Sequence, residues 1–428
     1  MPAHKAAGLA LPRCYTAPML LDLSPLRRHR DYRLLFLGQG LSFFGSMLTI
    51  VALPYQIFKL TGSSLAVGMI STVELVALLA SALWGGAFAD AFDRRRLLIG
   101  AELLLALGSS ALAWNAARAH PSIWLLYVIA GLMSAFNGFH RPALESMTPR
   151  LVEPHELPAI AAHGTLRYSV AAIGGPAIAG LLLARVGIVA TYCIDIATYA
   201  ISLLALWRIR SLRQPTSPDQ TDSSQAERPG LRSIATGLTF ALSRPELVGT
   251  YVVDLTANLF AMPMALYPAL SERYGGARAL GWLYAGMSIG SLLMTLLSGW
   301  TGRVKRHGLA VILAAALWGL AIAALGHAPT LPIAVLCLAL AGAADMVSGL
   351  FRMTIWNQTI PSHLRGRLAG VEMISYMTGP LLGNARAGWV ASLAGLRTSI
   401  VSGGLLCTVG VAACALLLPR FRRYRSTV

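Results

Sequence analysis

Long apolar runs constrain this chain more than any other feature of its sequence. We find twelve of them: 34–58, 66–89, 97–117, 122–143, 160–183, 188–207, 246–270, 280–301, 308–327, 332–358, 369–393 and 398–418. A helix of about 20 apolar residues crosses the hydrocarbon core of a bilayer. Of the 428 residues, 56% are hydrophobic and 12% are charged, about half the charged share of soluble proteins. Lipid must therefore be the solvent for most of the chain.

The charged residues cluster in short segments between these runs. The net charge of +17 could suggest nucleic-acid binding, but basic clusters between apolar runs are typical of cytoplasmic loops. When the spans alternate from an internal N-terminus, most Lys and Arg fall inside. Six fall on the opposite side: Lys59, Arg118, Arg185, Arg273, Arg278 and Arg397. We therefore expect a multi-pass protein of the cytoplasmic (inner) membrane with both termini cytoplasmic and no nucleic-acid partner.

One polar stretch divides the chain. Residues 214–230 are rich in Pro, Ser, Asp and Gln, a composition typical of a flexible linker. A short surface helix is expected at 231–243. The predicted parts are a cytoplasmic tail (1–30), a six-helix bundle (31–208), a cytoplasmic linker (209–245), a second six-helix bundle (246–419) and a basic tail (420–428).

The two halves resemble each other. Three matches recur in the same order. Ala52-Leu-Pro-Tyr55 is similar to Ala265-Leu-Tyr-Pro268. An Arg ten residues after a Gly is followed by a Pro (Arg141 and Pro149, Arg352 and Pro361), and a Gly-Pro pair comes later (Gly175-Pro176 and Gly379-Pro380). This order predicts a duplicated, pseudo-symmetric all-α membrane protein. Duplicated bundles that move about a central site are a recurrent transporter design.

Signatures of catalysis are missing from the sequence. It contains no GxxxxGK[ST] nucleotide loop and no HExxH zinc motif. A GxSxG pattern at 286–290 lies inside an apolar run, where small residues favour close helix packing rather than a nucleophile elbow. The five cysteines form no closely spaced pair. We expect no enzyme activity, no metal and no cofactor.

The loop after the second run carries a family resemblance. Gly86, Asp90, Arg94 and Arg95 resemble the GxxxD-R-x-G-R-R loop of the major facilitator superfamily, in which this loop is a conformational latch. Asp93 replaces the second glycine, as in the branch that includes the enterobactin (siderophore) exporter and macrolide efflux proteins. The resemblance covers about residues 30–420 and implies the major facilitator fold, with twelve helices in two bundles. Alternatively, the arginines only fix the topology.

A second, partial resemblance lies in the fifth span. Gly175, Pro176 and Gly180 resemble the antiporter motif of the superfamily, although Ala171 stands where the fuller motif has glycine. Gly379 and Pro380 are the counterparts in the second half. The alternative interpretation is a helix kink with close packing.

Ionisable residues inside the spans are costly to insert and are therefore functional candidates. Glu74, Asp254 and Asp345 are candidates for proton coupling, and the alternative for each is a structural pair or hydrogen bond. Asp195 is expected to be structural. Arg167 and Arg352 are candidates to balance carboxylates or to hold an anionic ligand. Glu102, Glu372 and Arg386 carry less weight.

Polar and aromatic side chains in the spans are candidates for the substrate pathway. They are Gln39, Arg167, Tyr168, Asn258, Tyr267, Tyr284, Arg352, Trp356 and Tyr376. A mostly apolar cavity with a few placed polar groups would suit a small organic ligand. The alternative for the aromatic residues is anchoring at the membrane interface.

Together the resemblance and the buried charges predict a monomeric secondary exporter. It would use the proton gradient to move a small molecule, a siderophore of the enterobactin type, across the lipid bilayer by alternating access. The alternatives are a multidrug or macrolide efflux pump of the same superfamily and a non-transporting membrane scaffold or sensor. The buried charges argue against the scaffold, which has no use for their insertion cost.

Overall fold

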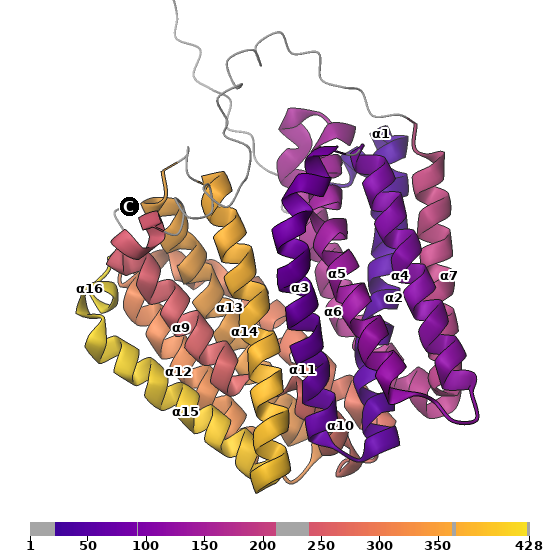
Figure 1. The fold of residues 1–428 in the computed structure, drawn as a ribbon. Coiled ribbons are helices and arrows are strands. Elements are labelled where there is room, and N and C mark those ends of the chain that lie inside the picture. The colour runs from indigo at the N-terminus through magenta and orange to yellow at the C-terminus, as the bar shows by residue number, and fades with distance from the viewer. Residues whose placement is uncertain (1–21, 92, 211–238, 362–364, 426–428) are drawn as a thin grey trace, which may run out of the picture.

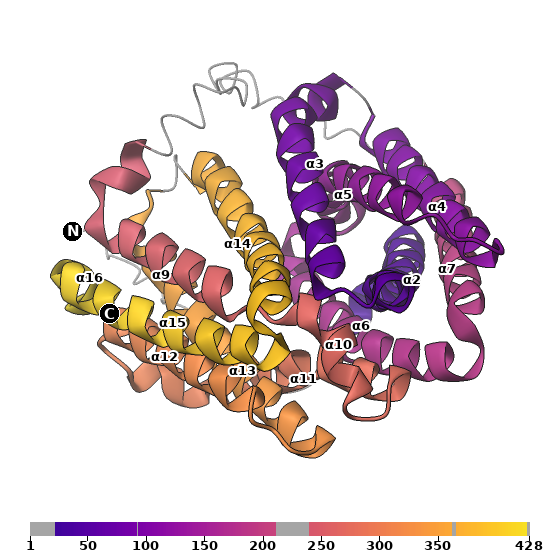
Figure 2. The same ribbon diagram turned by 60° about the horizontal axis from the view of Figure 1, so that its bottom comes forward.

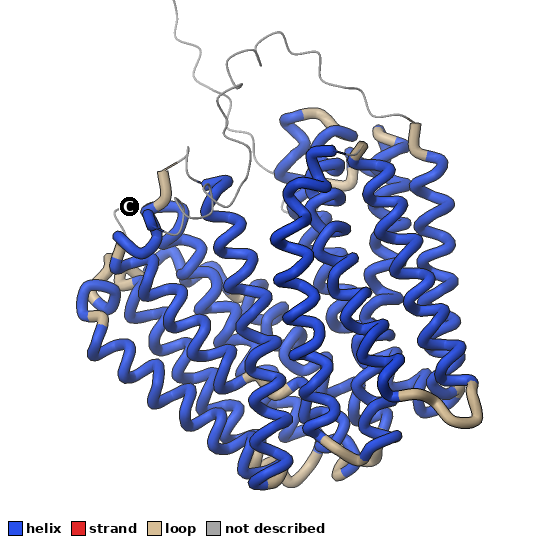
Figure 3. Tube along the Cα trace, in the orientation of Figure 1, coloured by secondary structure: helices blue, strands red, loops and turns tan. Residues whose placement is uncertain are grey.

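The computed structural model describes residues 22–91, 93–210, 239–361 and 365–425. Within these ranges the regular structure is helical, without a strand (Figure 3). The helices form two bundles side by side (Figures 1 and 2). The predicted all-α fold is confirmed.

The first bundle contains six long helices that follow a short one. They are α1 (Ser24–Arg28), α2 (Arg30–Thr61), α3 (Ser64–Ala91), α4 (Arg94–Ala117), α5 (Ile123–Met147), α6 (Leu157–Arg185) and α7 (Gly187–Arg208). Two short 3-10 helices, Thr148–Leu151 and Pro154–Glu156, connect α5 to α6.

The second bundle repeats this plan with one interruption. Its helices are α9 (Pro245–Ala261), α10 (Tyr267–Glu272), α11 (Ala277–Leu296), α12 (His307–Leu325), α13 (Leu331–Thr359), α14 (Arg365–Ala394), α15 (Leu396–Leu417) and the short α16 (Pro419–Arg422). Eleven spans in the described residues are long and apolar enough to cross a membrane. The helix α14 covers the remaining predicted span, 369–393.

The predicted span 246–270 exists, but it is not one helix. The helix α9 ends at Ala261, and a 3-10 turn over Met264–Leu266 precedes α10. Pro263 has no N–H with which to continue the helical ladder. The side-chain oxygen of Asn384 on α14 accepts a hydrogen bond from the backbone N–H of Ala265 at 3.0 Å, so the broken backbone is partly satisfied inside the protein.

Two further boundaries differ from the sequence prediction. The predicted span 280–301 ends early, because α11 stops at Leu296 and a 3-10 helix covers Ser298–Arg303. Of the predicted surface helix at 231–243, residues 239–243 are helical, and the rest lies outside the described residues.

The bundles contact each other mainly through two helix pairs, α3 with α14 and α6 with α11, and less extensively through α2 with α10 and α11. The backbones meet at glycines: a Cβ built on Gly180 would lie 2.7 Å from the backbone N of Gly281, and one on Gly388 would lie 2.9 Å from the Cα of Gly68. Both contacts lie at the end away from the linker, where Lys59 also pairs with Glu272 at 2.9 Å. Toward the linker end the bundles diverge (Figure 1).

Candidate functional site

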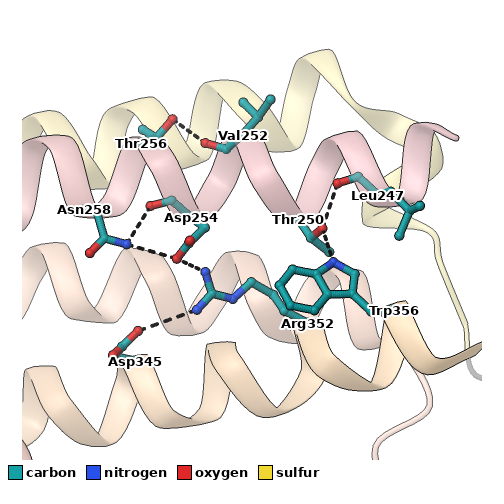
Figure 4. Close-up of polar contacts among 9 residues, drawn as sticks. All are labelled: Leu247, Thr250, Val252, Asp254, Thr256, Asn258, Asp345, Arg352 and Trp356. Atoms are coloured by element: carbon teal, nitrogen blue, oxygen red, sulfur yellow. Dashed lines mark hydrogen bonds and ion pairs between the residues drawn. The ribbon is translucent and has the colours of Figure 1, made fainter. Parts of the chain in front are cut away.

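A buried ion pair joins α9 and α13 in the second bundle (Figure 4). Arg352 forms it with Asp254, and both residues are buried. A second carboxylate, Asp345, lies two turns before Arg352 on α13, with its Oδ1 3.8 Å from the Arg352 Nη2. This distance allows Coulomb attraction but exceeds a hydrogen bond. The Asp345 side chain is 39% exposed, so only one of the two carboxylates is held tightly.

Asn258 holds the buried carboxylate in place. Its Nδ2 donates to the Asp254 carbonyl and to the Asp254 Oδ1, both at 3.0 Å. The backbone of α14 packs on the same amide, since a Cβ built on Gly379 would lie 2.9 Å from the Asn258 Cβ. The Gly379-Pro380 pair therefore brings α14 against the charged site.

Trp356 provides a second link between α9 and α13. Its indole N–H donates to Thr250 Oγ1 at 2.8 Å, and its ring stacks on Tyr251 with centroids 5.6 Å apart. Trp356 lies one turn beyond Arg352 on the same helix (Figure 4). The Arg352–Asp254 ion pair and the Trp356–Thr250 hydrogen bond together hold Arg352 in a fixed position, as a ligand-binding guanidinium requires.

Two tyrosines from opposite bundles border this site. Tyr168 on α6 is 58% exposed and Tyr376 on α14 is 55% exposed, and their hydroxyls lie within electrostatic range of each other and of Asp345. Phe43 of α2 stacks on Tyr168 with ring centroids 5.7 Å apart. The structure thus brings Tyr168, Tyr376, Asp345 and Arg352 together.

Glu74 on α3 and Tyr284 on α11 approach each other from opposite bundles. The Tyr284 hydroxyl on α11 lies within electrostatic range of the Glu74 carboxylate on α3. Tyr284 also packs edge-on against Tyr267 at 4.9 Å between centroids. Among the described residues the buried Tyr267 hydroxyl has no hydrogen-bond partner. The structure thus brings Glu74 near Tyr284, a residue of the second bundle.

Gln39 lies inside the first bundle rather than on a face that a substrate could reach in this conformation. It is 2% exposed, and its amide Nε2 donates to Glu102 Oε2 at 2.9 Å and to Ser202 Oγ at 3.0 Å. Asp195 is equally buried and accepts hydrogen bonds from Thr49 and Ser109 at 2.6 and 2.7 Å. Hydroxyl groups thus satisfy Asp195, whereas only one oxygen of Glu102 is bonded, and its buried Oε1 has no hydrogen-bond partner among the described residues.

Arg167 lies on α6 beside Gly40 of α2, where a Cβ built on that glycine would lie 3.5 Å from its Cδ. Two neighbours in electrostatic range are Tyr32 and His140. In the second bundle, Arg386 donates from Nη2 to the Phe260 carbonyl at 2.7 Å and ties α14 to α9. The side chain of Glu372 lies outside the described residues.

Sequence reasoning missed His140 and Arg141 on α5 as site candidates. The buried Nε2 of His140 has no hydrogen-bond partner in the described part of the chain. Arg141 pairs with Glu145 at 3.1 Å, and it lies within electrostatic range of Tyr168 and Tyr376. The internal repeat, which matches Arg141 to Arg352, is the sequence signal that could identify Arg141.

The described part of the latch loop acts within the first bundle. Asp93 caps α4 by accepting hydrogen bonds from the backbone N–H of Arg95 and Arg96 at 3.0 and 3.1 Å. The Arg95 guanidinium donates to the carbonyls of Leu206 and Trp207 at the end of α7. Gly86 and the side chains of Asp90 and Arg94 lie outside the part of the chain whose side chains are described, so the latch role remains a prediction.

The Gly175-Pro176 motif lies where α6 touches two other helices. A Cβ built on Gly175 would lie 2.5 Å from the Met47 Cβ on α2, and Gly180 meets Gly281 of α11 as described above. The helix α6 is continuous through Pro176. Close packing is therefore visible at this motif, and its predicted connection to antiport is left to experiment.

Among the described residues, no group of three or more His, Cys, Asp or Glu side chains is placed to hold a metal ion. The chemistry that this arrangement offers is charge exchange: one fixed cation, one tightly held carboxylate and one carboxylate with solvent access. Such a site can bind anions or protons, and it contains no nucleophile paired with a base.

The fold and this site define a membrane transporter built from two bundles. Residues 35–371 match the model of the Major Facilitator Superfamily, and the chain belongs to this family. Of the curated proteins, it is similar to the Enterobactin exporter EntS of Escherichia coli O81 (strain ED1a), with 30% identity over 410 residues that cover 95% of this chain and 96% of the exporter.

Solved structures of other transporters share the fold. The peptide transporter POT in complex with sulfate superimposes with a TM-score of 0.70 at 13% identity, covering 92% of this chain and 95% of that one. A bacterial homologue of the iron transporter ferroportin in the inward-facing state gives a TM-score of 0.66 at 14% identity, covering 92% and 98%. At these identities the likeness concerns the fold alone.

Proposed function

We propose that the chain is a proton-coupled secondary exporter whose substrate is a siderophore of the enterobactin type. It would work by alternating access as a monomer in the cytoplasmic membrane, with both termini in the cytoplasm. The similarity to the Enterobactin exporter over 95% of the chain supports the substrate class. The basic loop segments support the orientation.

The proposal depends on one observation: Arg352 binds the Asp254 carboxylate tightly and the Asp345 carboxylate loosely. Asp254 is buried against Arg352, whereas Asp345 is 39% exposed at 3.8 Å from it. A proton or an anionic substrate that reaches Asp345 and Arg352 changes the charge balance of the site. A ligand that binds one conformation better than the other shifts the equilibrium between them, which is the basis of coupling. Glu74 on α3, within electrostatic range of Tyr284 on α11, is the second candidate for proton exchange.

The direct test is transport in inside-out membrane vesicles. With an imposed proton gradient, we expect uptake of enterobactin into the vesicles, and a protonophore should abolish it. In cells, deletion under iron limitation should lower the secreted siderophore. Normal secretion together with increased sensitivity to macrolides would contradict the siderophore assignment and favour a drug efflux pump, which the exposed aromatic residues Tyr168 and Tyr376 would also suit.

A further inference from the structure

Tyr168 faces the interior of the transporter rather than lipid. Leu166 and Val170 on the same helix are 45% and 57% exposed, as expected of a lipid-facing surface. Residues two positions apart on a helix point about 200° apart, nearly to opposite sides. Because Tyr168 is two positions from each of them, its own exposed ring points away from their surface, toward the second bundle.

Tyr376 lies across the space between the bundles from Tyr168. It comes from α14, in the other bundle, yet its hydroxyl is in electrostatic range of the Tyr168 hydroxyl. Both rings keep more than half of their surface exposed, which is unusual for tyrosines inside a membrane protein unless they border an accessible space. In the first bundle, Phe43 stacks on Tyr168 and limits the orientations of its ring.

The charges beside the two rings are of both signs. Asp345 and Arg352 lie on α13, and Arg141 lies on α5 of the first bundle. The Asp345 carboxylate has exposed surface and no hydrogen bond at its 3.8 Å approach to Arg352, so it can accept from a ligand hydroxyl. The Arg141 guanidinium is half-exposed, contacts Glu145 through Nε, and lies within electrostatic range of both tyrosine hydroxyls.

We propose that Tyr168 and Tyr376 form a clamp, one ring from each bundle, that binds a planar aromatic ring carrying acidic oxygen substituents. The tyrosine faces stack on the ligand ring, ligand hydroxyls donate to Asp345, and Arg141 and Arg352 balance ligand anionic oxygens. Aromatic pairs prefer centroid separations of about 4.5–7 Å, so closure of the bundles would tighten the clamp. This inference rests on the proposed exporter function and narrows its substrate to aromatic acids and catechols.

The test is equilibrium dialysis with the full chain in lipid nanodiscs. The probes are enterobactin, 2,3-dihydroxybenzoate as an aromatic fragment, and cyclohexanecarboxylate as a non-aromatic anion. The variants are Tyr168→Leu and Tyr376→Leu, with Tyr168→Phe and Tyr376→Phe to keep the ring. Trp124→Leu is the control, since Trp124 is an exposed aromatic at the start of α5, 80% exposed, at the end away from the linker.

We expect each Leu variant to weaken enterobactin binding about fivefold or more, a value in the range of aromatic pair energies. The Phe variants should stay within about twofold of the wild type, and the control should be unchanged. Cyclohexanecarboxylate should bind more weakly than 2,3-dihydroxybenzoate, and its affinity should not depend on either tyrosine.

The outcomes separate the clamp from the exporter assignment. If enterobactin binds equally well to the wild type and both Leu variants, the clamp is wrong and the exporter function stands. If only 2,3-dihydroxybenzoate binds, and only with both rings present, the clamp stands and the siderophore assignment fails. If neither aromatic probe binds the folded wild type, the clamp is wrong as well.

Discussion

The two bundles treat buried carboxylates in different ways. In the first bundle, Asp195 receives hydrogen bonds from the hydroxyls of Thr49 and Ser109, and the described side chains around it include no cation within ion-pair distance. In the second bundle, Asp254 is paired with Arg352, and a further carboxylate shares the same guanidinium at longer range. The insertion cost of an ionisable group applies to both.

This difference indicates that Asp195 has a structural role, whereas the charges around Arg352 can exchange partners. A carboxylate enclosed by neutral donors has little reason to change partners, and it links helices of one bundle. A guanidinium between a tightly held and a loosely held carboxylate can release one of them to a proton or a ligand without losing the other. We therefore expect substitutions of Asp195 to affect stability and substitutions at the Arg352 site to affect transport.

Arg352→Gln should have the largest effect. It leaves the buried Asp254 without its cation, which typically destabilises a protein by about 3–5 kcal/mol, and it removes the anion site, so transport should be abolished. Thermal unfolding in detergent and vesicle transport would measure the two effects. As a control, the double variant with Asp254→Asn should recover stability but not transport. Transport that survives in the single variant would show that the site is not a coupling site.

Asp345→Asn should lower transport at least about tenfold, because the site loses its exchangeable charge, and change the stability little. Substitutions of partly exposed groups usually alter the free energy of unfolding by about 0.5 kcal/mol or less. Transport rates at several pH values, normalised to the folded protein, would check this. An unaltered pH profile would assign the coupling to another group, such as Glu74.

Asp195→Ala should show the reverse pattern. It leaves the buried hydroxyls of Thr49 and Ser109 without their acceptor, at a cost of about 1–3 kcal/mol, while transport per folded molecule stays close to wild type. The melting temperature and the normalised transport rate would be measured together. A coupling role for Asp195 would be revealed by full stability with lost transport.

Lys59→Glu should have the smallest effect. Lys59 and Glu272 join the bundles, but both are more than 40% exposed, and exposed pairs contribute about 0–1 kcal/mol. We expect less than a twofold change in transport rate, which the charge-swapped Lys59→Glu with Glu272→Lys should restore. A larger loss that the swap does not repair would indicate a role other than pairing.

The sequence predicted the architecture well because apolar length and basic-loop asymmetry are strong local signals. The break between α9 and α10 was not predicted, because mean hydropathy over a span does not reveal a short interruption of the helix. Pro263 is the residue that could have indicated it. In the site, the proximity of Asp345 and Arg352 could be predicted, because their spacing of about two turns places them on the same face of one helix. The pairing of Arg352 with Asp254 could not be predicted in this way. It depends on how α9 packs against α13, and about 100 residues of chain separate the two side chains.

For the remaining site candidates, the sequence could not predict the direction in which each side chain points. Gln39 and Tyr168 both looked like polar groups within a span, yet one lies inside a bundle and the other faces the space between the bundles. Hydrophobic periodicity separates the lipid face of a helix from the rest, but it cannot say which of the other faces meets a neighbour and which meets solvent.

If the two bundles rotate against each other, the close glycine contacts at Gly180–Gly281 and Gly68–Gly388 are where they would pivot. Gly180 lies 23 residues after the start of α6 at Leu157, which is a lever arm of about 35 Å at 1.5 Å per residue. A tilt of about 10° around these points would sweep the linker end through about 6 Å by this geometry. Small rotations near the pivots are therefore amplified where the arms are longest.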